Sequence, residues 1–117
     1  MAASNAFWAD LHERLEDDPE FASQYLLEAV KISTVDRLVN TLESERTKEQ
    51  ISKAALARMI QRDPAAIRRF LSEASGNPTI ETVSSVAAAM GLRLELVPME
   101  DSERETVSDP LRALANS

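Results

Sequence analysis

Three arginines lie within eight residues of one another in the middle of the chain: Arg62, Arg68 and Arg69. A guanidinium group carries a permanent charge and presents its N–H donors as a planar fork. This fork suits phosphate groups and the acceptor edge of guanine. These side chains could therefore bind a polyanion, or they could be ordinary solvated charges on a helix surface.

The total charge of the chain counts against a polyanion, but the distribution of charge does not. The 117 residues include 13 Lys and Arg and 20 Asp and Glu, which gives a net charge of −7. Residues 51–78 contain five basic and two acidic residues, so this segment is positive while both of its flanks are acidic. Any positive field is therefore local to this segment.

Two short helices with a tight connection are predicted around the arginines. Ser52 is a good N-cap for a helix that runs to about Ile60. Asp63 can cap a second helix, with Pro64 at its first position. The residues of this pair that would face inward are apolar, and one of them, Ala57, is small enough for a close helix crossing: Leu56, Ala57, Ile60, Ile67 and Leu71.

The remaining positions of the second helix would face outward. Ala65 and Ala66 are small, which would let the start of this helix enter a DNA major groove, while Arg68 and Arg69 could reach guanine edges or phosphates. The free N–H groups at the start of the helix could also bind a phosphate. The pattern is that of a helix–turn–helix, and it favours a binding face over a solvated one.

The first part of the chain is predicted to contribute helices to the same core. Residues 6–17 have amphipathic spacing, and Phe7 and Trp8 either pack inside or contact a partner. Asp18 and Pro19 form a start signal for a second helix. We expect a break or kink over residues 31–34, followed by a further apolar stripe of Val35, Leu38, Val39 and Leu42.

The last part of the chain is predicted to hold one helix, one strand and a tail. Thr79 can cap a helix whose buried side includes Ile80, and Gly91 would end that helix. The alternation of Leu92, Leu94 and Leu96 with charged residues predicts a short strand. No other segment has the sequence pattern of a strand, so this one would either pair with a strand of another molecule or remain an extended segment outside any sheet. Residues 99–117 are predicted to be a mobile acidic tail.

Composition narrows the possible function classes. The chain has no cysteine, two glycines and 4% aromatic residues, which favours helices and leaves no thiolate zinc site or cysteine nucleophile. His12 has no companions at metal-ligand spacing. We find no signal peptide, no apolar run long enough for a membrane span and no paired catalytic residues. We therefore expect a cytoplasmic protein that is not an enzyme and uses no cofactor.

Residues 18–98 resemble the addiction-module antidote proteins, a branch of the lambda-repressor-like (XRE) helix–turn–helix family. The resemblance rests on three stretches, and the third is the most specific: DPEFASQYLLEA, ISKAALARMI and FLSEASGNPTIETVSSVAAAMGLRLELVP. It implies a bundle of about five helices that binds operator DNA in bacteria. It also implies a RelE-type toxin as partner, an mRNA-cleaving ribonuclease that the antidote inhibits.

The resemblance also assigns roles and shows departures. Ser52 and Lys53 would approach phosphates, while Pro64, Ala65, Ala66, Arg68 and Arg69 would lie on the recognition helix. Gln61 stands where the family usually has a turn glycine. Arg62 stands where an apolar residue is typical, and Arg68 where an aromatic one is common, so the DNA contacts are expected to differ from those of the family.

Together these observations predict an all-α DNA-binding protein with a helical extension (1–17), a helix–turn–helix domain (18–98) and a tail (99–117). We expect a homodimer, because two recognition helices about 34 Å apart would match a palindromic operator. Its role would be that of an autorepressing antitoxin. Two alternatives stay open: a solitary transcriptional regulator, and a protein-binding module that has lost DNA binding.

Overall fold

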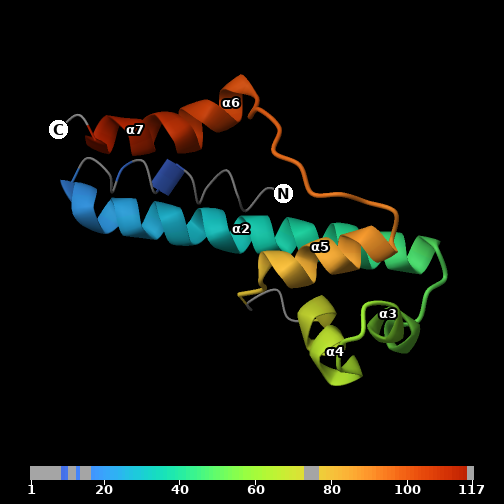
Figure 1. Cartoon of the computed structure of the whole chain (residues 1–117). Coiled ribbons are helices and arrows are strands. Elements are labelled where there is room, and N and C mark those ends of the chain that lie inside the picture. The colour runs from blue at the N-terminus through green and yellow to red at the C-terminus, as the bar shows by residue number, and fades with distance from the viewer. Residues whose placement is uncertain (1–8, 11–12, 14–16, 73–76, 116–117) are drawn as a thin grey trace. The chain divides into compact units, whose positions relative to one another are not determined.

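The computed structural model describes residues 9–10, 13, 17–72 and 77–115 of the chain (Figure 1). All the regular secondary structure of this part is helical, which confirms the predicted all-α class. The elements are α2 (Pro19–Lys48), α3 (Lys53–Met59), α4 (Pro64–Ser72), α5 (Ile80–Ala89), α6 (Asp101–Glu103), the π-helix η1 (Arg104–Ser108) and α7 (Asp109–Ala115). None of the described helices is both long and apolar enough to cross a membrane. Phe7 and Trp8 lie outside the described residues.

The chain divides into two compact units, one of residues 32–96 and one of residues 1–31 together with 97–117. The helix–turn–helix segment and all the residues predicted to contact DNA belong to the first of these units.

Helix α2 is continuous over 30 residues, so the predicted break at residues 31–34 is wrong. Its buried residues change face along its length. Ala22 and Leu26 are buried in the first part, and Val35 and Leu42 belong to the buried stripe of the second. The step from Leu26 to Val35 covers about two and a half turns, which places the second stripe on the opposite face of the helix. Such a change of phase resembles a helix break in the sequence, although the backbone hydrogen bonds continue through it.

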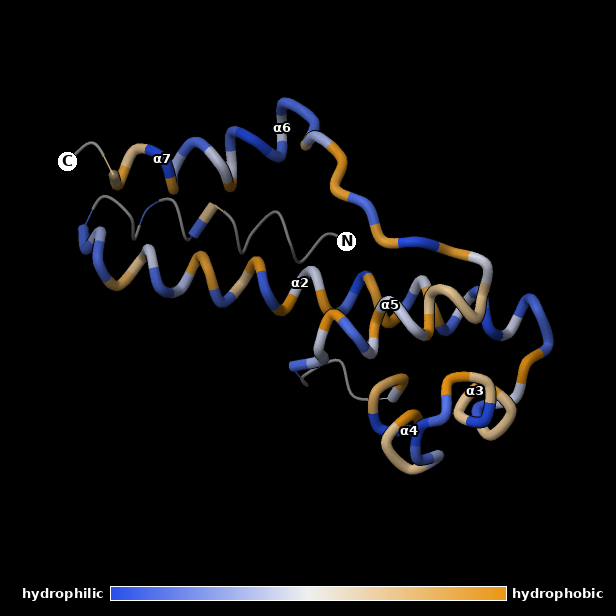
Figure 2. The backbone as a smooth tube through the Cα atoms, viewed as in Figure 1, coloured by the Kyte–Doolittle hydropathy of each residue, from blue (hydrophilic) through white to orange (hydrophobic). Residues whose placement is uncertain are grey.

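The core of the 32–96 unit is apolar and draws on four helices. It contains no fully buried polar side chain among the described residues. Ile60, Phe70 and Leu92 pack against its edge. Figure 2 shows that the last turns of α2, beyond this core, are hydrophilic. The buried members come from α2, α3, α4 and α5: Leu42, Leu56, Ala57, Ile67, Leu71, Val83, Val86, Ala87 and Met90.

The predicted caps of α3 and α5 are confirmed. The Ser52 hydroxyl accepts a hydrogen bond from the Ala55 N–H at 3.0 Å, and the Thr79 hydroxyl accepts one from the Thr82 N–H at 3.1 Å. The prediction that Ile80 is buried is wrong, since 76% of its surface is exposed. It lies in the first turn of α5, one turn before the core begins.

Three helices end in the same hydrogen-bonding pattern, the Schellman motif, in which a left-handed residue follows the helix. At the end of α3, Gln61 has φ 55°, and the N–H of Arg62 donates to the Ala57 carbonyl at 2.9 Å. Gln50 (φ 59°) and Gly91 (φ 77°) hold the corresponding positions after α2 and α5. Glycine alone adopts this conformation without steric cost, so both glutamines are strained by about 1 kcal/mol or more.

The predicted strand is not formed. Residues 92–100 have no regular secondary structure, and Figure 1 draws them as a plain trace after α5. Leu92 packs against the core, whereas Leu94 is 38% exposed and Leu96 is fully exposed. A strand needs a hydrogen-bonded neighbour, and no other described segment supplies one.

The predicted tail contains helices over residues 101–115, which the sequence analysis did not expect. Val107, Leu111 and Leu114 are half-buried and spaced four and three residues apart, an amphipathic signal that the acidic composition obscured. The helix widens into η1 just before Pro110. Proline has no N–H and its ring crowds the carbonyl four residues earlier, so the Asp109 N–H donates instead to the Arg104 carbonyl, five residues back.

The substitution Gln61→Gly is expected to raise the free energy of unfolding by about 1 kcal/mol, because it removes the left-handed strain at the end of α3. Urea unfolding followed by circular dichroism measures this change. Gln24→Gly, in an exposed turn of α2, is the matched control and should lower the stability by about 0.5–1 kcal/mol. A loss of stability in both variants would show that position 61 is not left-handed.

Candidate nucleic-acid interface

Helices α3 and α4 pack against each other through buried apolar residues. Leu56 and Ala57 of α3 are completely buried, and Ile67 and Leu71 of α4 have 1% and 5% of their surface exposed. The predicted inward residues of the motif are confirmed here, with Ile60 partly buried at the edge. Because Ala57 carries only a methyl group, its position allows the backbone of a neighbouring helix to approach closely.

The packing of α4 fixes which of its residues face outward. At 100° per residue, Arg69 and Ala65 fall on the side opposite Ile67 and Leu71, whereas Arg68 lies on the flank, about 80° from the centre of that buried face. Both arginines are exposed, and neither forms an ion pair with a carboxylate of the described residues. Two guanidinium groups are thus presented to solvent by a helix whose opposite face is held in the core.

The small residues at the start of α4 are less open than predicted. Ala65 and Ala66 are half-buried, whereas Pro64 is exposed. Ala66 lies on the flank of the helix, where it lines a surface pocket of about 300 Å³. The same pocket is lined by the stem of Arg69 and by residues from α2, α4 and the approach to α5: Val35, Phe70, Asn77, Pro78 and Thr82.

Arg62, the third predicted arginine, is engaged in an ion pair. Its guanidinium lies 2.8 Å from the Glu81 carboxylate of α5, with 37% of the Arg62 side chain exposed. Arg62 holds the position after the left-handed Gln61, where a Schellman motif usually places an apolar residue. The ion pair replaces that apolar contact and joins the α3–α4 turn to α5, so less of its charge is available to a polyanion.

The residues at the start of α3 are placed at the corner between α2 and α3. The Ser52 hydroxyl is the helix cap, and Lys53 is half-buried in the first turn. Lys53 is close enough to Glu43 for its charge to lower the pKa of that carboxyl. Both predicted phosphate-binding residues therefore also have a role within the protein.

A further ionic contact fixes the same corner. Arg46 donates from its guanidinium to both carboxylate oxygens of Glu43 and, at 2.7 Å, to the Ile51 carbonyl just before α3. The hydrogen bond from Arg46 lowers the pKa of Glu43 by more than partial burial raises it. This contact ties the end of α2 to the segment that leads into α3.

Asp63 weakens the predicted phosphate site at the N-terminus of α4. Its carboxylate accepts a long hydrogen bond, 3.4 Å, from the Ala65 N–H at the start of α4. A negative charge at this position competes with a phosphate for the free N–H groups of the helix N-terminus. The exposed arginines, not the N-terminus of α4, are therefore the main attraction for an anion.

Sequence reasoning missed both ionic contacts. Glu43 and Arg46 are three residues apart in a helix, a local signal, but they fall in the charged stretch LESERTKEQ that lacks apolar spacing. Arg62 and Glu81 are separated by 19 residues, so no local signal exists. The described residues include no group of three or more His, Cys, Asp or Glu that could hold a metal ion.

Compared with known proteins, the chain matches no family model, no curated protein and no solved structure. Any proposal about function therefore depends on the geometry of this site and on the sequence pattern.

The substitution Glu43→Gln is expected to lower the free energy of unfolding by about 1 kcal/mol at pH 7, because it removes a charge-assisted hydrogen bond. A carboxyl with a lowered pKa stabilises the fold above its ordinary pKa of about 4.3, and this contribution is lost as the pH falls through the lower value in the folded state. The difference between wild type and variant should therefore shrink as the pH falls below the ordinary carboxyl pKa and vanish once Glu43 is protonated in the folded state. Urea unfolding at several pH values tests this.

The control is Glu49→Gln, which alters an exposed carboxylate in the following turn and should change the stability little at any pH. A pH-independent loss in Glu43→Gln would mean that packing of the side chain, and not its charge, stabilises the corner.

Proposed function

We propose that this protein is a sequence-specific DNA-binding transcriptional regulator that uses α4 as its recognition helix. The observation that carries the proposal is the presentation of Arg68 and Arg69. Both residues are exposed and neither forms an ion pair among the described residues; Arg69 lies on the face of α4 opposite the buried Ile67 and Leu71, and Arg68 lies on the adjoining flank. Rigid support of this kind is what base recognition requires of a helix in the major groove.

The electrostatics support binding through a limited surface. Residues 51–78 contain five basic and two acidic residues, although the chain as a whole has a net charge of −7. Arg62 is paired with Glu81, which leaves Arg58, Arg68 and Arg69 as exposed cations of the two motif helices. So few phosphate contacts give weak binding at physiological salt. A homodimer on a palindromic operator would double them.

We further propose that the regulator is the antitoxin of a toxin–antitoxin module in a bacterial cytoplasm. This part rests on the resemblance of residues 18–98 to the antidote proteins. The acidic surface outside the helix–turn–helix suits a basic toxin, because opposite charges speed association and fix orientation. The alternative of a pure protein-binding module is less favoured, since that function gives no reason for two exposed arginines on α4.

Replacing both arginines (Arg68→Ala with Arg69→Ala) is expected to weaken binding to the operator by about 1–3 kcal/mol for each base that an arginine recognises. The probe is the DNA upstream of the protein's own reading frame, titrated by fluorescence anisotropy at two salt concentrations. The logarithmic salt slope should fall by about one unit for each phosphate that the truncated side chains no longer neutralise.

The matched control is Arg112→Ala, an exposed arginine of α7 outside the motif, which should leave the affinity unchanged. Equal affinity of the wild type and the double variant for the operator would show that α4 does not contact the DNA. Absence of operator binding by the wild type would overturn the proposal.

The antitoxin role predicts a small basic protein encoded beside this one that arrests growth when expressed alone. Co-expression of the present chain should restore growth, and the two proteins should co-purify. The double arginine variant should still restore growth, because the DNA face is separate from toxin neutralisation. If no such toxin is encoded beside this protein and the protein still binds its operator, it is instead a solitary regulator.

A further inference from the structure

Residues 92–96 read Leu-Arg-Leu-Glu-Leu, and this order is self-complementary. In an antiparallel pair of two copies centred on Leu94, Leu92 lies opposite Leu96, and Arg93 lies opposite Glu95 on both sides of the centre. Opposite charges on directly facing residues stabilise such a pair, as do facing apolar side chains. A shift of the register by one residue would place leucines opposite charged side chains.

The structure leaves this segment open to a second molecule. Among the described residues, the backbone N–H groups of residues 93–97 have no hydrogen-bond partner. Leu96 and Val97 have 101% and 75% of their surface exposed. An unpaired extended backbone with exposed leucines is a template for strand addition.

The side chains of the segment already have the alternation of a strand. Arg93 and Glu95 lie on the same side, with Arg93 Nε 3.2 Å from the Glu95 carboxylate. Their side chains are 86% and 60% exposed, so a facing copy can exchange this contact within one chain for two contacts between chains. Leu92 and Leu94 line a pocket beside α2, which Arg93 also borders.

We propose that two copies of this chain associate by antiparallel pairing of residues 92–96, with Leu94 on the two-fold axis. Such an interface is isologous, because each residue of the ladder meets its complement in the second copy. The inference deepens the proposed function, since it supplies the dimer that operator binding needs, and it rests on that function for its biological meaning.

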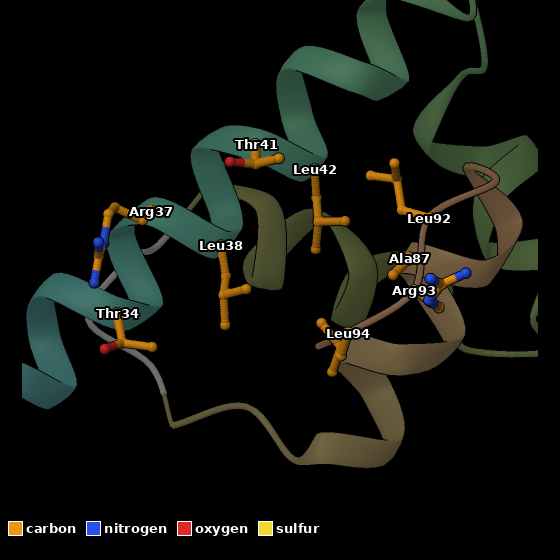
Figure 3. A pocket seen from close by; sticks show the side chains of 9 residues that line it. All are labelled: Thr34, Arg37, Leu38, Thr41, Leu42, Ala87, Leu92, Arg93 and Leu94. Atoms are coloured by element: carbon orange, nitrogen blue, oxygen red, sulfur yellow. The ribbon is translucent and has the colours of Figure 1, made fainter. Parts of the chain in front are cut away.

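A surface pocket beside the segment indicates what the pairing would cover. The pocket has a volume of about 400 Å³ and lies between α2 and residues 92–94. Figure 3 shows Leu38 and Leu42 of α2 on one side of it and Leu94 on the other. Because alternate residues of a strand share one face, the leucines of a second copy would extend this apolar surface over the pocket.

The ladder has natural ends. Gly91 turns the chain with φ 77° at one end, and Pro98 cannot donate a hydrogen bond at the other. Pairing is therefore limited to a few residues, which fixes the length of the ladder and restricts its register.

Cysteine cross-linking tests the pairing and its register in the full chain, which contains no cysteine. Leu94→Cys would face its own copy at a Cα separation of about 4.5–5.5 Å, within disulfide range. Leu96→Cys is the control, because its two copies would be about 13 Å apart along the ladder. Under a mild oxidant without DNA, the Leu94→Cys variant should form covalent dimer about tenfold faster than Leu96→Cys.

Random collision would give the opposite order, since Leu96 is the more exposed of the two. Equal or faster cross-linking of Leu96→Cys would overturn the register. Absence of cross-linking in both variants would overturn the pairing and leave the segment for a strand of a different protein or the pocket for a small ligand.

Charge exchange provides a second test at exposed residues whose substitution does not disturb the core. Arg93→Glu and Glu95→Arg each place like charges opposite one another, so each should raise the dimer dissociation constant about tenfold in sedimentation equilibrium. An equimolar mixture of the two variants should restore dimers, because each chain then carries the complement of the other. If the mixture dissociates like the single variants, the pairing is wrong.

Both tests are made without DNA, so they fail independently of the proposed function. If the wild-type chain binds operator DNA but the Leu94→Cys variant shows no preferential cross-linking, the proposed DNA binding stands and this interface is wrong. If the Leu94→Cys variant cross-links preferentially but the wild-type chain binds no operator DNA, this interface stands and the proposed function is wrong.

Discussion

The close packing of α3 against α4 at Ala57 is the interaction on which the rest of the candidate site depends. Ala57 has no exposed surface, and Ile67 and Leu71 are buried beside it. Once these residues are inside, the helical repeat directs Arg69 away from the core and places Arg68 on the exposed flank of α4. A larger side chain at position 57 would separate the helices and turn the arginines with them, because a packed core absorbs added volume only by moving backbone.

The corners around this packing are held by unusual residues. Two of the three Schellman ends use glutamine where glycine would be unstrained, and one places Arg62 where an apolar residue is usual. The ionic contacts Arg62–Glu81 and Arg46–Glu43 lie at these same corners. Ionic contacts thus brace turns whose backbone and apolar contacts are suboptimal. The Arg62–Glu81 contact also leaves less unpaired positive charge at the α3–α4 turn.

Local patterns determined much of this molecule. The all-α class, the caps Ser52 and Thr79, the stop at Gly91 and the inward residues of α3 and α4 all follow from interactions within about one helical turn. Such interactions depend only on neighbouring residues, so the sequence contains them in full. The left-handed conformation of Gln61 was foreseeable for the same reason, because the position after a helix end selects it.

The tertiary structure decided what depends on distant partners. It kept α2 continuous through a change of buried face, left residues 92–100 without a strand and made residues 101–115 helical. It also paired Arg62 with a residue of another helix and turned Ala66 toward a pocket. In each case the local structure depends on contacts with residues that are distant in the sequence. By itself the sequence determined the capped starts of α3 and α5, the stop at Gly91 and the inward residues of α3 and α4. Only packing between elements decided which charges stayed free, because the partners in an ion pair such as Arg62–Glu81 lie far apart in the chain.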